Sequence, residues 1–118
     1  MREADIQQAI VDYLNAVLLP AYRVFAVPNA SRRTRSGKAS NAVPGLRKGV
    51  PDLIVLGRGK AFQIEVKRER GKLSDAQSEW GTWSVVTSGT PWACVKNIDE
   101  VRLALSQWMV PTREAAQP

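Results

Sequence analysis

The chain has 118 residues, a length that suits one domain with a single buried core. Hydrophobic residues make up 44% and charged residues 24%, which are ordinary values for a globular protein and argue against wholesale disorder. The formal charge of +6 indicates a polyanionic partner, of which nucleic acid is the commonest. The single cysteine cannot form an internal disulfide, and no apolar stretch matches a signal sequence or a membrane span. We therefore expect a reducing, cytoplasmic setting without membrane contact.

The first part of the chain predicts a helix, a strand and a long basic connection. Apolar residues recur at helical spacing over residues 2–18, and Pro20 ends that pattern. Residues 22–27 are typical of a strand. Residues 29–49 are rich in Ser, Gly, Arg and Lys, and a connection of that length is usually functional. We expect a flexible basic loop there.

A predicted hairpin then places three ionisable groups on one face. Residues 52–57 and 60–67 are typical of strands, and the two residues between them fit a tight hairpin turn. That closure sets Asp52 opposite Glu65, with Cβ atoms roughly 5 Å apart. Lys67 shares their face because side chains alternate along a strand. The other face collects apolar residues suited to packing against a helix, namely Leu53, Val55, Phe62, Ile64 and Val66.

The last part of the chain predicts two helices around a fourth strand. A capping-box spacing from Ser74 to Gln77 opens a helix that runs to about Val86. Residues 92–96 predict a strand, and Asn97 caps a final helix. The resulting order, α-β-β-β-α-β-α, is that of an α/β sheet with helices packed on it. We expect one domain over residues 1–110 and a disordered, frayed tail over 111–118.

The facing carboxylates of Asp52 and Glu65 have two interpretations. A solvated strand face with a surface ion pair to Lys67 is common and contributes little to stability. Two like charges directly opposite each other repel, however, and a bound cation would remove the conflict. Since the chain has no histidine, oxygen ligands indicate a hard ion, Mg²⁺ or Mn²⁺, and not zinc. We favour the metal site.

At these residues the chain resembles a known nuclease superfamily. Gly49-Val50-Pro51-Asp52 followed by Glu65-Val66-Lys67 is similar to the PD-(D/E)xK signature, whose restriction-endonuclease-like fold has an αβββαβ core with a mixed four-stranded sheet. Within that superfamily the chain resembles the VRR-NUC family, especially its small stand-alone members of phage and bacterial type. The further matching positions are Glu3, Pro28-Asn29, Lys48, Leu53, Leu73-Ser74, Gln77 and Trp80.

The resemblance implies Mg²⁺-dependent hydrolysis of DNA phosphodiesters, with Mn²⁺ as a substitute ion. It implies four metal ligands, which are Glu3, Asp52, Glu65 and the Val66 carbonyl. It implies catalytic roles for Asp52, Glu65, Lys67 and Gln77. It also suggests a homodimer acting on branched DNA such as Holliday junctions, in a bacterial or phage-infected cell.

Two of these assignments have structural alternatives. An acid such as Glu3 in the first turn of a helix is also favoured by the helix dipole. Gln77 can complete a capping box at the start of its helix or make a polar contact to the active site, and the two interpretations are equally good.

The long loop is interpreted as a phosphate-contacting flap, although charge runs often simply face water. Its candidate DNA-binding residues are Asn29, Arg32, Arg33, Arg35, Lys38, Arg47 and Lys48.

Other residues are expected to be structural. Cys94 lies in an apolar run and is interpreted as a small buried core residue, because no histidine is present to activate it. Tryptophans such as these four lie in a core or an interface more often than they serve as base-stacking platforms.

The leading function is a structure-selective endodeoxyribonuclease. A flap- or restriction-type nuclease and a catalytically silent DNA-binding module are the alternatives.

Overall fold

A mixed four-stranded sheet forms the centre of the molecule. The structure, a computed structural model, describes residues 1–28 and 43–114. The strands lie in the order β1-β2-β3-β4. The first three are antiparallel neighbours, and β4 runs parallel to β3. Their bounds are Tyr22–Ala26, Leu53–Gly57, Lys60–Val66 and Trp92–Val95.

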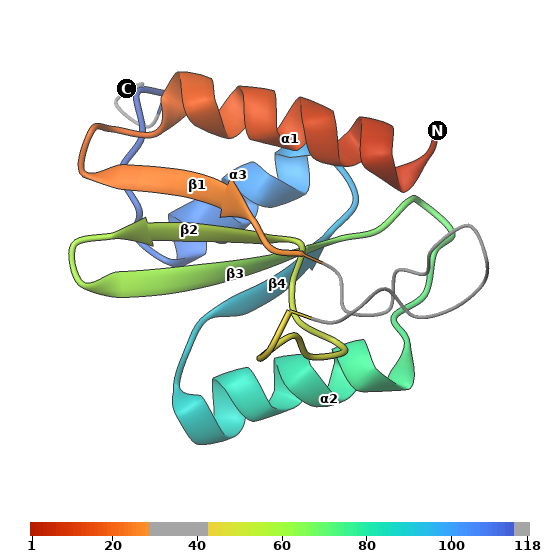
Figure 1. The fold of residues 1–118 in the computed structure, drawn as a ribbon. Coiled ribbons are helices and arrows are strands. Elements are labelled where there is room, and N and C mark those ends of the chain that lie inside the picture. Colours follow the sequence, from red (N-terminus) through yellow and green to blue (C-terminus); the bar gives the residue numbers. More distant parts are fainter. Residues whose placement is uncertain (29–42, 115–118) are drawn as a thin grey trace.

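Helices cover both sides of this sheet (Figure 1). Helices α1, Glu3–Val17, and α3, Ile98–Gln107, lie on one side, while α2, Asp75–Trp83, lies on the other. A short π-helical segment η1, Ser84–Ser88, continues α2. The observed order confirms the predicted α-β-β-β-α-β-α arrangement and the α/β restriction-endonuclease-like class. Among the described residues, none of the helices has the length and apolar character that crossing a membrane requires.

The core lies between the sheet and the α1–α3 layer. The apolar face predicted from the hairpin is buried as expected, with Leu53, Val55 and Ile64 fully enclosed. Helix α1 contributes Ile10 and Leu14, which are also fully enclosed. Burying side chains of this size stabilises a fold by about 1.5–3 kcal/mol each. This packing holds β2 and β3 firmly, so the residues at their ends have defined positions.

The hairpin adopts the predicted register. Gly57 pairs with Lys60 and Leu53 pairs with Ile64. Arg58 and Gly59 have positive φ values of 53° and 78°, as a tight two-residue turn of this hand requires. The same register continued by one residue sets Asp52 against Glu65. The register on which the site prediction depends is therefore confirmed.

Helix α2 is attached to the other face of the sheet by specific contacts. Its N-terminus has the predicted capping box between Ser74 and Gln77. Trp80 donates a hydrogen bond from Nε1 to the side-chain oxygen of buried Gln63 on β3, at 2.7 Å. A Cβ at Gly81 would lie only 2.7 Å from the ring of Trp92, so the helix backbone packs directly on that ring. These contacts hold the second half of α2 against the middle of β3 and the start of β4.

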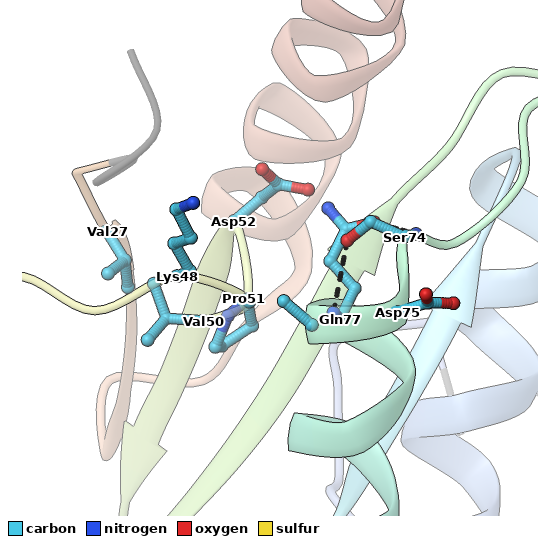
Figure 2. Close-up of a pocket in the computed structure, with 10 residues that line it drawn as sticks. Val27, Lys48, Val50, Pro51, Asp52, Ser74, Asp75 and Gln77 are labelled. Atoms are coloured by element: carbon cyan, nitrogen blue, oxygen red, sulfur yellow. Dashed lines mark hydrogen bonds between the residues drawn. The ribbon is translucent and has the colours of Figure 1, made fainter. Parts of the chain in front are cut away.

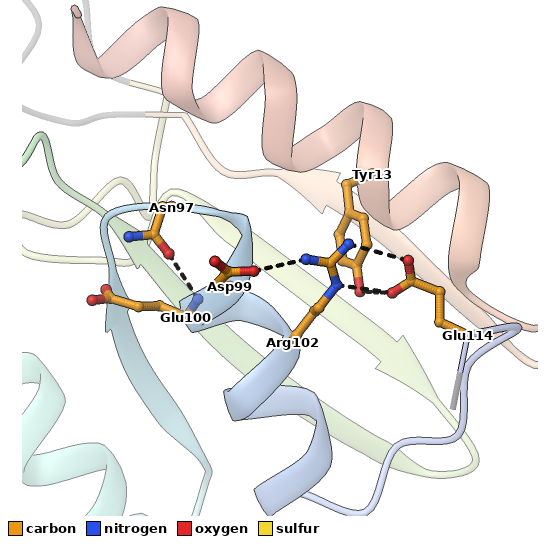
Figure 3. Close-up of polar contacts among 6 residues, drawn as sticks. All are labelled: Tyr13, Asn97, Asp99, Glu100, Arg102 and Glu114. Atoms are coloured by element: carbon orange, nitrogen blue, oxygen red, sulfur yellow. Dashed lines mark hydrogen bonds and ion pairs between the residues drawn. The ribbon is translucent and has the colours of Figure 1, made fainter. Parts of the chain in front are cut away.

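The chain end differs from the expected frayed tail. Residues 111–114 are held against α1: Leu18 pairs with Thr112, and the Arg113 amide donates to the Val17 carbonyl. Glu114 accepts a hydrogen bond from the Tyr13 hydroxyl at 2.7 Å and pairs with Arg102 of α3 (Figure 3). The ordered chain thus extends beyond residue 110, and residues 115–118 lie outside the described part.

Candidate active site

Asp52 and Glu65 come together at the ends of β2 and β3. Asp52 immediately precedes β2, and its carboxylate accepts a 2.7 Å hydrogen bond from the Val66 amide of β3. Its own carbonyl accepts from the Val27 amide at 2.9 Å, so both the side chain and the backbone carbonyl of Asp52 are held. Glu65 lies within β3 on the face covered by α2. The two acids therefore share one face, as predicted.

Glu65 is a buried acid whose environment disfavours the ionised form of its carboxyl. Only 1% of the residue is exposed, and its Oε1 atom is buried without a hydrogen-bond partner among the described residues. Burial, followed by the neighbouring Asp52 carboxyl, raises the pKa of Glu65 to about 9. In the absence of a cation the Glu65 carboxyl therefore holds a proton at neutral pH.

Lys67 supplies the nearest positive charge. Its Nζ atom lies 4.0 Å from Glu65 Oε2, and the residue is buried. Its amide donates to the Val95 carbonyl at 2.9 Å, which fixes the backbone beyond the end of β3. The Lys67 charge lowers the pKa of Glu65, but burial and Asp52 outweigh it. The ion pair alone does not resolve the conflict between the two acids.

Gln77 carries out both of the roles that its position suggested. Its side-chain oxygen accepts from the Ser74 amide at 2.9 Å, which completes the capping box. Its Nε2 atom donates to Glu65 Oε2 at 3.0 Å. One amide thus joins the first turn of α2 to the buried acid of β3, and it orients the Glu65 side chain.

A pocket of about 400 Å³ opens beside these groups. Figure 2 shows Lys48 and Asp52 extending from the loop before β2, with Ser74 and Gln77 at the start of α2 across from them. The loop approaches α2 closely at Gly49, where φ is +83° and a Cβ would collide with the Ala76 carbonyl oxygen. Glycine is therefore required there both by backbone conformation and by space.

The donor set suits a hard divalent cation. Asp52 and Glu65 offer carboxylate oxygens, and the unpaired Glu65 oxygen is an acceptor that a cation would satisfy. Within residues 1–28 and 43–114, no three acidic, histidine or cysteine side chains lie close enough together to hold a metal. Glu3 starts α1, and its charge raises the pKa of Glu65 only weakly. Ligation by Glu3 and by the Val66 carbonyl therefore stays a prediction.

The candidate DNA-binding residues divide into two sets. Arg47 and Lys48 are exposed and lie at the pocket end of the basic connection. Five others, Asn29, Arg32, Arg33, Arg35 and Lys38, lie outside the described residues. Contact of either set with DNA stays a prediction.

Two residues differ from expectation. Gln63 is buried on the face of β3 that also carries Glu65, yet it belongs to no motif that the sequence displays. The same period of two that placed Glu65 and Lys67 on that face includes Gln63 and could have identified it. Cys94 is only partly buried and pairs with Glu65 across the β3–β4 ladder, so it lies on the side of the sheet that faces α2 and not in the core. Burial raises the pKa of its thiol, which disfavours the nucleophilic thiolate.

Comparison with known proteins agrees with this geometry. The family model of the VRR-NUC domain matches residues 2–91, which is most of the chain and includes Asp52, Glu65, Lys67 and Gln77. No curated protein and no solved structure matches the chain. The match extends from the start of α1 to the residue before β4. The chain therefore belongs to the VRR-NUC family, whose domain is a nuclease of the PD-(D/E)xK type.

Proposed function

We propose that the protein is a Mg²⁺-dependent endodeoxyribonuclease, for which Mn²⁺ can substitute, and that Asp52 and Glu65 hold the ion. One observation carries the proposal. Glu65 is buried beside a second carboxyl, and one of its oxygens has no partner within the part of the chain that the structure describes. This arrangement costs stability in the metal-free protein, and a divalent cation would relieve it. Structural acids are rarely left in this state.

Each residue of the site has a distinct role in the proposed hydrolysis. The ion, when bound, supplies Lewis acidity that acidifies water and neutralises charge on the scissile phosphate. Asp52 and Glu65 hold it, and Gln77 keeps the Glu65 carboxyl oriented through its 3.0 Å hydrogen bond. The pocket beside Asp52, with Lys48 in its wall, receives the phosphodiester.

In the proposed mechanism, Lys67 acts on the attacking water. Its buried amine lies 4.0 Å from Glu65 Oε2, where it can orient the attacking water or take up its proton. The water oxygen then bonds to phosphorus, the P–O bond to the leaving nucleotide breaks, and the leaving oxygen takes up a proton from solvent water. Lys67 afterwards returns its proton to solvent. When protonated, the same amine can hold a phosphate oxygen. An arginine could provide the charge but could not accept the proton, because its pKa stays far above working pH.

The preferred substrate in this proposal is branched DNA, such as a four-way junction, cut by a homodimer. A two-fold dimer presents two identical sites, which suits paired cuts in two strands. The formal charge of +6 favours a polyanionic duplex, and each neutralised phosphate strengthens binding through counterion release. A cytoplasmic location in a bacterial or phage-infected cell completes the proposal.

The test compares Glu65→Gln with Glu69→Gln. The first variant keeps the shape of the buried acid and its contact with Gln77 but cannot carry charge, whereas Glu69 is exposed beyond the end of β3. Both are assayed on labelled linear, flap, splayed and four-way DNA with Mg²⁺, with Mn²⁺ and with EDTA. We expect Glu65→Gln to abolish metal-dependent cutting and Glu69→Gln to retain it.

Four outcomes would count against parts of the proposal. Undiminished cleavage by Glu65→Gln would remove the metal site, and cleavage in EDTA would remove the need for an ion. Equal cutting of linear and four-way DNA would replace structure selectivity with a restriction-type activity. DNA binding without cleavage under every condition would indicate a catalytically silent DNA-binding module.

A further inference from the structure

A second pocket lies along α2, next to the candidate active site but separate from it. It has a volume of about 410 Å³ and is lined by Arg47, Glu79, Trp80 and Trp83. Arg47 directly precedes Lys48, which lines the first pocket, so one short segment borders both. The volume falls within the range of roughly 300–1,000 Å³ that is usual for small-ligand sites.

The two tryptophans form a supported aromatic surface. Trp80 is fixed through its hydrogen bond to Gln63, which saturates its only polar atom. Trp83 packs against it with ring centroids 5.2 Å apart and an interplanar angle of 50°. Despite this packing, 43% of Trp83 is exposed. A rigid, half-exposed indole beside a cation is the arrangement with which proteins stack single-stranded bases.

The charges around the pocket favour a base over a phosphate as its occupant. Glu79 lines the pocket and would repel a phosphate placed inside it, whereas its carboxylate can accept hydrogen bonds from the amino group of a base. Arg47 is exposed and can bind the backbone phosphate beside that base or stack on its ring. The pocket therefore matches a nucleotide with its base inside and its phosphate toward Arg47.

The position of this pocket relative to Asp52 and Glu65 also suits a nucleotide of the bound strand. Trp83 lies six residues after Gln77 on α2, which is about 9 Å along the helix axis. Successive base pairs are separated by about 3.4 Å along each strand of a duplex. A strand whose phosphate lies beside Asp52 can thus place a base a few nucleotides away against Trp83.

We propose that the pocket of Arg47, Glu79, Trp80 and Trp83 binds an unpaired base of the DNA substrate, close to the phosphodiester that is cut. The inference rests on the proposed function and adds that its substrate has a base that is unpaired, or that can leave its pair, at a branch, flap or end. Bases inside an intact duplex are stacked on their neighbours and cannot enter such a pocket.

The experiment measures binding of the full chain in EDTA, so that no cleavage is needed. Fluorescence anisotropy follows three labelled DNAs: a fully paired duplex, the same duplex with an unpaired overhang, and that overhang with abasic positions in place of its bases. The protein variants are Trp83→Ala, Trp83→Phe, and Leu103→Ala as a control at an exposed apolar residue of α3.

We expect Trp83→Ala to weaken binding to the overhang DNA by about 5- to 150-fold, the range that stacking of one base supplies. Binding to the paired duplex and to the abasic overhang should be unchanged. Trp83→Phe should restore most of the loss because it keeps an aromatic ring, and Leu103→Ala should have no effect. The abasic DNA should bind the wild type as weakly as the intact overhang binds Trp83→Ala.

An equal loss on all three DNAs, or no loss on any, would overturn the proposal. The proposal would also be overturned if Trp83→Ala changed the oligomeric mass of the DNA-free protein in solution. The indole would then belong to a contact between two copies of the chain. Failure of the nuclease proposal would give a different result from failure of this base-binding proposal. Cleavage would then be absent with Mg²⁺ while the Trp83-dependent preference for unpaired DNA in EDTA persists.

Discussion

At the scale of single residues, Glu65 is the group whose environment most strongly opposes its charge. Its carboxyl is buried, faces Asp52, and has one oxygen without a hydrogen-bond partner among the described residues. A proton and a divalent cation are two ways of relieving the same conflict. The metal-free and metal-bound proteins should therefore respond differently to pH.

The first prediction concerns the pH dependence of stability in EDTA. The pKa of Glu65 rises from an ordinary value of 4.5 to about 9 on folding. Between these values the folded protein holds a proton that the unfolded chain releases, so the free energy of unfolding falls as pH rises. One proton corresponds to a slope of at most about 1.4 kcal/mol per pH unit. Thermal unfolding in EDTA from pH 5 to pH 9 measures it.

Glu65→Gln is the matched control for this prediction, because a neutral amide cannot titrate. It should flatten the slope without lowering stability at pH 5. Mg²⁺ should raise the melting temperature of the wild type more at pH 9 than at pH 6, since at the lower pH it must displace the proton. A wild-type slope equal to that of Glu65→Gln would contradict the raised pKa.

The second prediction separates charge from proton transfer at Lys67. We compare Lys67→Met, which removes both functions, with Lys67→Arg, which keeps the charge alone. If the amine moves a proton, both variants should lose about 10²–10⁴-fold in cleavage rate while DNA affinity changes little. Lys72→Met, at an exposed lysine, serves as the control. Near-normal cleavage by Lys67→Arg would assign Lys67 a purely electrostatic role.

At the scale of elements, the site depends on how the loop before β2 meets the first turn of α2. The capping box orders that turn, and Gln77 extends its hydrogen bonding to Glu65. Gly49 allows the loop to pass against the backbone of the same turn. The helix therefore positions the acids through its backbone and its cap.

The third prediction uses two glycines with the same backbone requirement. Gly45 and Gly49 both have positive φ, +95° and +83°, so alanine is strained at either position. A Cβ at Gly45 has no neighbour within 4 Å in residues 1–28 and 43–114, whereas at Gly49 it meets the Ala76 carbonyl. Gly45→Ala should cost about 1–2 kcal/mol, and Gly49→Ala should cost more and also slow cleavage. Chemical denaturation and DNA cleavage measure the two effects.

Equal costs for the two variants would mean that the loop can move away from α2 without consequence. Normal cleavage by Gly49→Ala would show that the approach of loop and helix does not position Asp52.

The hairpin explains why this part of the site could be predicted. A two-residue turn leaves a single register, and that register brings Asp52 and Glu65 together. The capping box was equally local, since Ser74 and Gln77 lie three residues apart. By contrast, the bond from Trp80 to Gln63 joins a helix to a strand 17 residues away, and no local pattern indicates it.

At the scale of the whole molecule, the features that differed from expectation all depend on tertiary packing. Residues 111–114 read as a polar chain end, but Tyr13 and Arg102 hold Glu114 in place from two different helices. Cys94 sits in an apolar run, yet its strand position puts it beside Glu65 and not in the core. Composition and periodicity describe segments, and neither indicates which segments meet.

Within the described part of the chain, the sheet also carries two half-exposed apolar side chains. Phe25 on β1 and Leu56 on β2 point to the side of the sheet that carries α2, and they are 49% and 51% exposed. Phe25 pairs with Ile54, which shares the face of Leu56, so the exposed groups are neighbours. Contiguous apolar surface of this kind often marks a protein–protein contact. It is the surface on which we place the proposed dimer contact.

The fourth prediction tests that contact with Leu56→Glu. In a two-fold interface the substituted residue occurs twice, so two charges enter one apolar contact and the dimer should dissociate. Leu103→Glu, at a similarly exposed position on α3 across the sheet, should leave the mass unchanged. Light scattering after size exclusion measures the mass. A monomeric wild type, or an unchanged Leu56→Glu dimer, would contradict this contact. If the contact exists, Leu56→Glu should still nick DNA but should lose paired cuts across a four-way junction, because each molecule then brings only one site.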